Sequence, residues 1–213
     1  NKQDEVLNIH RDTYQSLRNE ILVGGKEMVT RLETMTANAL IDSVNSHLPP
    51  KPKSFTYREY REAVEQAQHD LEVPIELPFL QLNDEKQAGT KMSREDFEYE
   101  VQDLARRNVA KVMRTLEKLP GQADANLRPI LLESIDSVWA EHLEEMDLLH
   151  RGVQWRQLAQ QDPETQFKLE AFSLFGESVS RMERELVKGP FKQMLGLREI
   201  LEPMVSEKAS QNA

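Results

Sequence analysis

The 213-residue chain contains no cysteine, and this absence excludes disulfide bonds, thiolate metal ligands and thiol nucleophiles. Glycine is also scarce, with 8 residues, which is about half of its ordinary share of a chain. Gly24 and Gly25 are the only close pair, and no segment matches the phosphate-binding loop or the dinucleotide fingerprint. The sequence therefore contains no recognisable nucleotide site, and we predict no bound cofactor and no catalytic site in this chain.

Positively charged residues are in the minority. The chain has 27 Lys and Arg residues against 37 Asp and Glu residues, so its formal net charge is -10 and its pI is near 5.1. A nucleic-acid-binding domain needs a basic footprint, so this balance argues against nucleic acid as a partner. No apolar run approaches the roughly 18 residues of a membrane span, and no signal segment opens the chain. We expect peripheral membrane association at most, and the start at Asn1 within a helical pattern suggests a processed chain or a fragment.

Helical periodicity dominates what is present, because apolar residues recur at spacings of three and four along most of the chain. The predicted helices cover 4–22, a segment from Met28 towards Pro49, segments that start after Thr56 and Ser93, and finally 127–156 and 163–187. Thr56 followed by Glu59 forms a capping box, and Ser93 with Asp96 marks another helix start. No alternating run is long enough to predict a sheet, so we predict an all-α fold. The last two helices have a short connection and should form an antiparallel hairpin.

Glycine and proline mark the expected breaks. Gly24–Gly25 and Pro49–Pro50 interrupt the first pattern, and residues 73–91 show no period and are expected to form a loop. Gly189–Pro190 is expected to end the last long helix, before a short helix around 191–202 and a frayed tail.

The helix 127–156 has the longest regular apolar stripe. Its members lie within about 100° of arc on one face: Leu127, Leu131, Ile135, Val138, His142, Met146, Leu149 and Val153. His142 is one turn from Glu145, and Asp147 is one turn from His150. A carboxylate–histidine pair of this kind is half of a di-metal bundle site, but His142-x-x-Glu145 has the reverse order of the Glu-x-x-His motif and no partner motif exists. We interpret His142 as a hydrogen-bonded core histidine and predict no metal site.

Charged residues form two patterns on the predicted helices. Six acids lie between 131 and 150 without an intervening Lys or Arg, and we interpret them as a solvated face: Glu133, Asp136, Glu141, Glu144, Glu145 and Asp147. A basic stripe could contact an anionic partner or lipid headgroups, although we favour a solvated face: Arg107, Lys111, Arg114 and Lys118. Trp155 and Leu158 flank the expected turn, and they either dock on another domain or form a contact surface.

Sixteen residues between Asp136 and Phe175 match a known family at fixed spacings. They are Asp136, Trp139, His142, Leu143, Met146, Asp147, Leu149, Gly152, Arg156, Gln160, Asp162, Pro163, Lys168, Glu170, Phe172 and Phe175. This segment resembles the C-terminal region of SecA, the ATP-driven motor of bacterial protein export. The segment DEVLNIHRDTYQSLRNEIL, residues 4–22, is similar to the long scaffold helix of that family. The region between them is similar only through Pro49–Pro50, the Val73–Pro74–Ile75 loop and its helix lengths.

The resemblance implies a division into part of a helical scaffold (1–48), a small helical wing (49–125), a two-helix finger (126–190) and a short helix with a tail (191–213). In that family the scaffold contacts the motor domains and the finger, and the finger enters the cytoplasmic mouth of the SecYEG channel. The implied partners are the motor domains of a parent chain, the SecYEG channel and unfolded preprotein, with ATP and Mg on the motor only. The implied location is cytoplasmic and peripheral, at the inner face of the bacterial membrane.

The resemblance also implies roles for individual residues. The finger tip, which would contact the polypeptide and the channel, consists of Trp155, Arg156, Gln157, Leu158 and Gln160. Arg18 and Glu20 would form a contact between scaffold and motor. The residues expected to pack the hairpin are Trp139, His142, Met146, Phe172 and Phe175. The expected function is a non-catalytic one, which couples ATP hydrolysis elsewhere to preprotein movement. The alternatives are a free-standing helical adaptor with a similar hairpin and a metal-dependent helical enzyme.

Overall fold

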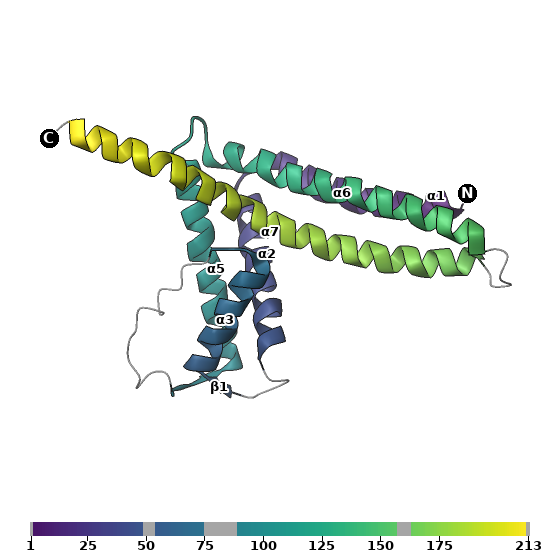
Figure 1. Ribbon diagram of the computed structural model, residues 1–213, viewed down its shortest axis with the longest axis horizontal. Coiled ribbons are helices and arrows are strands. Elements are labelled where there is room, and N and C mark those ends of the chain that lie inside the picture. Colours follow the sequence, from purple (N-terminus) through teal and green to yellow (C-terminus); the bar gives the residue numbers. More distant parts are fainter. Residues whose placement is uncertain (1, 49–53, 75–88, 157–162, 212–213) are drawn as a thin grey trace. The chain divides into compact units, whose positions relative to one another are not determined.

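The computed structural model describes the backbone of residues 2–48, 54–74, 89–156 and 163–211, and the side chains of 5–48, 54–74, 89–152 and 165–199. The helices are α1 (Lys2–Val23), α2 (Lys26–His47), α3 (Tyr57–Leu71), α5 (Arg94–Leu116), α6 (Ala123–Arg156) and α7 (Pro163–Gln211) (Figure 1). Two short strands, β1 (Ser54–Thr56) and β2 (Lys91–Ser93), pair antiparallel. The prediction of an all-α fold is confirmed, and among the residues that the structure describes this ribbon of paired strands is what the prediction did not include.

The chain folds into two compact units, each built from two separated segments. Unit 1 comprises Asn1–Gly24 and Arg128–Leu186, and unit 2 comprises Gly25–Leu127 and Val187–Ala213. The first boundary coincides with Gly24 and Gly25, whose φ angles of 69° and 78° cannot continue a right-handed helix. α2 belongs to unit 2, together with the central region of the chain.

Unit 2 is built around α2, α3 and α5, which run side by side in Figure 1. Phe97 is fully buried at its centre, with its ring centroid 5.5 Å from that of Phe55 and 5.6 Å from that of Tyr60, both edge-on. Such edge-to-face contacts stabilise a core beyond the burial of the ring area. Phe55 and Met92 are the central residues of β1 and β2 and pair with each other, so the ribbon buries one side against the same core.

Each strand ends in the residue that caps the next helix. The Thr56 hydroxyl accepts from the Glu59 amide at 3.3 Å, and the Glu59 carboxylate accepts from the Thr56 amide at 2.7 Å. Ser93 and Asp96 exchange the equivalent bonds at the start of α5. The predicted capping box at Thr56 and the predicted helix start at Ser93 are confirmed, and both capping boxes satisfy backbone donors that the first turn would leave unpaired. The bonds from the Thr56 backbone and hydroxyl lower the pKa of Glu59.

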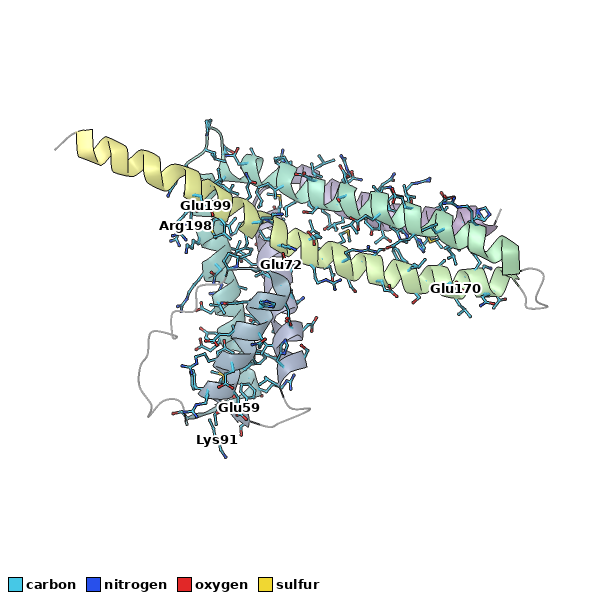
Figure 2. The ribbon with its side chains drawn as sticks, in the orientation of Figure 1. Glu59, Glu72, Lys91, Glu170, Arg198 and Glu199 are labelled. Atoms are coloured by element: carbon cyan, nitrogen blue, oxygen red, sulfur yellow. The ribbon has the colours of Figure 1, made fainter. Side chains whose placement is uncertain are left out.

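The predicted break at Gly189–Pro190 is wrong, because α7 runs without interruption to Gln211. The separate short helix around 191–202 and the frayed tail are wrong for the same reason. Val187, Phe191 and Met194 are buried in unit 2 and lie on one helical face. Their burial offsets the cost of a proline inside a helix, which is about 3 kcal/mol. Lys188 adds an ion pair of 2.6 Å to Glu72, the left-handed residue that ends α3 (Figure 2).

Candidate functional site: the three-helix unit

Unit 1 contains α1 and the parts of α6 and α7 that form the predicted hairpin. At one end of the hairpin the rings of His150 and Phe167 lie 6.4 Å apart, and at the other the Ser134 hydroxyl donates to the Glu185 carbonyl at 3.2 Å. The residue numbers rise in one helix as they fall in the other, so the two helices are antiparallel, as predicted from their short connection (Figure 1). α6 ends at Arg156 and α7 begins at Pro163.

The first helix packs along this hairpin with the same regularity. Four layers join α1 to α6, one helical turn apart: Val6 with Met146, His10 with His142, Tyr14 with Trp139, and Arg18 with Asp136. α1 is therefore antiparallel to α6 along at least three turns. The apolar residue Ile9 is 51% exposed on α1, and the neighbouring His10 is buried instead. The regular spacing of four from Val6 to Tyr14 is the signal that would have indicated His10.

A cluster of rings occupies the centre of unit 1. His10 Nδ1 lies 3.0 Å from His142 Nε2, and both side chains are fully buried. The Phe175 ring stacks on His10 with centroids 4.1 Å apart and an interplanar angle of 1°. Tyr14 and Trp139 complete the cluster, with centroids 4.8 Å apart. His142 is thus a hydrogen-bonded core residue, as its position on the apolar stripe predicts.

Burial shifts the protonation of this cluster. Desolvation and the neighbouring His142 lower the pKa of His10 to about 4. Burial also lowers the pKa of His142, and this effect is opposed by Glu145. Burial raises the pKa of Tyr14, partly offset by the Ser178 hydroxyl and by Arg181. At neutral pH the two histidines are therefore uncharged, because a charged imidazole loses its hydration at this position.

The acidic residues of α6 are largely paired, in contrast to the predicted solvated face. Arg181 on α7 donates to Glu141 at 3.1 Å and to both carboxylate oxygens of Glu145, at 2.7 and 3.0 Å. The hydrogen bond with Glu145 raises the pKa of Arg181. Asp147 pairs with Arg151 at 2.7 Å within α6. The sequence window 131–150 contains no Lys or Arg, so the partner of Asp147 comes from the next turn of α6 and the partner of Glu141 and Glu145 comes from α7.

Arg18, the expected motor contact, is engaged within unit 1. Its Nε donates to Asp136 Oδ1 at 3.0 Å and its Nη2 donates to Oδ2 at 3.4 Å. Both side chains are about half exposed, so one face of the guanidinium remains accessible to solvent. Glu20, the second expected contact, is exposed on α1.

The residues expected to pack the hairpin divide into two groups. His142 and Met146 are buried, and Trp139 and Phe175 are half-buried in the ring cluster. Phe172 differs from the prediction, because it is 59% exposed on α7, as is Leu169 at 68%. Phe167 and Ala171 occupy the buried positions of this turn instead. Of the predicted tip, Gln157, Leu158 and Gln160 lie outside the described residues, and Trp155 and Arg156 are described only as the last backbone positions of α6.

The remaining sequence-predicted groups lie apart from the ring cluster. Arg107 in the basic stripe of α5 pairs with Asp103, which also accepts from Arg106 at 3.3 Å. Within the part of the chain that the structure describes, no three His, Asp or Glu side chains are arranged to hold a metal ion. No described helix is long and apolar enough to cross a membrane.

Comparison with known proteins identifies the origin of this architecture. The family model of the SecA wing and scaffold domain matches residues 1–193. The chain belongs to the SecA wing and scaffold family. The match covers both units, and it therefore includes the helices between the two segments on which the sequence resemblance was strongest.

Individual SecA proteins are similar over nearly the whole chain. The protein translocase subunit SecA of Polaromonas sp. (strain JS666 / ATCC BAA-500) is 31% identical over 196 residues, which is 87% of this chain and 19% of the relative. That of Psychrobacter sp. (strain PRwf-1) is 24% identical over 211 residues, covering 99% of this chain and 22% of the relative. The SecA of Clostridium botulinum (strain Alaska E43 / Type E3) is 27% identical over 188 residues. The chain spans about a fifth of the length of these relatives.

Proposed function

We propose that this chain is the scaffold, wing and finger portion of a SecA-type translocase. In this proposal it couples ATP hydrolysis on motor domains elsewhere in the parent protein to preprotein movement through SecYEG. The observation that carries the proposal is the antiparallel hairpin of α6 and α7 with α1 packed along it, in a chain that belongs to the SecA family. The parent protein would act in the cytoplasm, at the inner face of the bacterial membrane.

The hairpin is suited to transmit force because its core is fixed at several levels. The cluster of Val6, Met146, Leu149, Phe167 and Ala171 holds three helices together, and the Arg181 ion pairs join α6 to α7 beside the ring cluster. A two-helix hairpin braced by a third helix can move as a rigid lever. We place the polypeptide and channel contact at the connection between α6 and α7, at Trp155, Arg156, Gln157, Leu158 and Gln160.

The tip assignment predicts a cross-link. Because this chain has no cysteine, Leu158→Cys introduces a single reactive thiol into this region. In the parent protein bound to SecYEG and a stalled preprotein, we expect Leu158→Cys to cross-link to the preprotein. The matched control is Gln66→Cys, at an exposed position on α3 in unit 2, which should not cross-link. A preprotein cross-link from Gln66→Cys but none from Leu158→Cys would reject the assignment.

The scaffold–motor contact predicts a change in ATPase rate. Arg18→Glu in the parent protein should alter the basal ATPase rate, because it reverses the charge that would face the motor. This substitution also breaks the ion pair with Asp136, so a second variant is needed. The double reversal Arg18→Glu with Asp136→Arg restores the pair inside unit 1 but leaves the reversed charge at position 18. A motor contact keeps the ATPase rate altered in the double variant, whereas a return to the parental rate would assign Arg18 to internal packing alone.

A further inference from the structure

The hydrogen bond between His10 and His142 is a polar contact between α1 and α6 that lies in apolar and aromatic surroundings. One turn away on either side are Val6 with Met146 and Tyr14 with Trp139, and Phe175 of α7 covers the His10 ring. A buried polar pair of this kind costs little while it is satisfied, and it favours the one register in which the partners meet. Sliding α1 by one turn would bury both imidazoles without this bond.

The bond requires that at least one imidazole be neutral. One ring nitrogen must donate and the other must accept, and a doubly protonated pair has no acceptor and carries two like charges 3.0 Å apart. The outer nitrogens, His10 Nε2 and His142 Nδ1, make no hydrogen bond within the described residues. In the neutral pair one outer nitrogen carries a hydrogen and the other is bare, so an added proton would place a second buried N–H without an acceptor.

The charged groups around the pair do not compensate for an added proton. Tyr14 from α1 and Ser178 from α7 are neutral neighbours of the cluster. Glu145 of α6 comes within 3.9 Å of His142 Nδ1, but both of its oxygens already accept from Arg181 of α7. Glu141 is held by the same arginine. The nearest anion is thus neutralised by a cation that faces the same histidine.

We propose that the His10–His142 hydrogen bond is an acid-sensitive latch that holds α1 in register against α6. In the closed state the pair is neutral and buried, and when α1 separates from the hairpin both imidazoles return to water and bind protons near their ordinary pKa of about 6.5. Mild acid therefore favours the open state. Between pH 7.5 and 5.5 the open population should rise about tenfold if one histidine titrates, and up to about a hundredfold if both do.

Amide hydrogen exchange of the whole chain, read by mass spectrometry, tests the latch. After correction for the pH dependence of chemical exchange, the protection of α1 should fall at least tenfold between pH 7.5 and 5.5. The protection of α3 in unit 2, which serves as the internal reference, should change less than about twofold. The ordinary pKa values of Asp and Glu, about 3.9 and 4.3, lie below this window, whereas that of histidine lies within it.

Two variants separate the latch from general acid sensitivity. In the double variant His10→Gln with His142→Gln, two amides can retain a hydrogen bond without titrating, so the protection of α1 should become independent of pH. The control His150→Gln removes the third histidine of unit 1, which faces Phe167, and should leave the pH response unchanged. If the double variant fails to protect α1 at pH 7.5, the single variant His10→Gln replaces it, and its response should be up to about tenfold smaller than that of the unmodified chain.

Imidazole nitrogen chemical shifts provide a readout that needs no variant. Both rings should be neutral and hydrogen-bonded at pH 7.5, and their ordinary titration should appear only together with exchange of α1. The latch is overturned if either histidine of the closed state is charged at pH 7.5, if the protection of α1 does not depend on pH, or if the glutamine variants keep the full response.

Discussion

Replacing Phe97 with alanine is expected to destabilise unit 2 by about 3–5 kcal/mol, the usual cost of truncating a buried phenylalanine. Phe97 is fully buried and contacts the rings of Phe55 and Tyr60, so its removal affects the strand ribbon and α3 as well as α5. The cavity would lie where three elements meet, and a site of this kind has little freedom to collapse. The loss is large compared with the total stability of an ordinary domain.

Chemical denaturation with two signals measures this effect. Both tryptophans, Trp139 and Trp155, lie in the sequence of unit 1, so tryptophan fluorescence reports on unit 1 while far-UV circular dichroism reports on all helices. In Phe97→Ala the circular dichroism signal should begin to fall at a lower denaturant concentration than in the unmodified chain. The tryptophan fluorescence should change only at a higher denaturant concentration. Tyr99→Ala is the matched control, because Tyr99 is 67% exposed on the same helix and its loss should change stability by less than about 0.5 kcal/mol. Equal effects of the two variants would contradict the assignment of Phe97 to the core.

Phe191→Ala is expected to have an effect of similar size and a second, local consequence. The buried face of Val187, Phe191 and Met194 is what keeps α7 continuous through Gly189–Pro190. Pro190 lacks the amide that would bond to the Leu186 carbonyl, and glycine adds about 1 kcal/mol of unfavourable helix propensity. Truncating the buried Phe191 side chain should reduce the free energy of unfolding by about 3–5 kcal/mol. Without this contribution the helix should break at Gly189–Pro190, where local propensity favours an end.

Hydrogen exchange along α7 distinguishes this break from general destabilisation. Amides after Pro190 should lose protection in Phe191→Ala while those between Pro163 and Leu186 retain it. Gln193→Ala, at an exposed position two residues away, should change neither segment. Uniform loss of protection along α7 would show that the helix does not depend on Phe191 for its continuity.

Periodicity predicted the helices of this protein because their apolar stripes are long. The stripe of α6 is buried at every described position from Leu127 to Leu149. The strand ribbon could not be predicted in this way, since Ser54–Thr56 and Lys91–Ser93 are each too short to show alternation. At Gly189–Pro190 local chemistry predicted a helix end, but three buried side chains on one face outweighed it. Local propensity decides a boundary only where tertiary contacts are weak.

The sequence predicted some of the buried residues of the candidate site, but it did not predict which residues they contact. The centre of an apolar stripe indicated that His142 is buried, but its partner is His10, 132 residues away, and one chain gives no signal for such a pairing. The same holds for Arg18 with Asp136 and for Arg181 with Glu141 and Glu145. These acids have no arginine or lysine in their own segment of α6, because their partners lie on α1 and α7. Ion pairs between helices depend on register, which only packing determines.

Each unit is built from two segments that are separated in the sequence, and this determines the order in which the helices can pack during synthesis. Unit 2 can assemble α2, α3 and α5 from one continuous segment, Gly25–Leu127, as soon as the ribosome has released it. α1 leaves the ribosome before unit 2 and α6, yet every layer that it forms with α6 requires residues beyond Arg128. During synthesis the apolar face of α1 therefore stays exposed until α6 has been made. More than a hundred residues, Gly25–Leu127, emerge from the ribosome between α1 and the segment that begins at Arg128. α1 is accordingly the segment for which a nascent-chain chaperone would be needed longest.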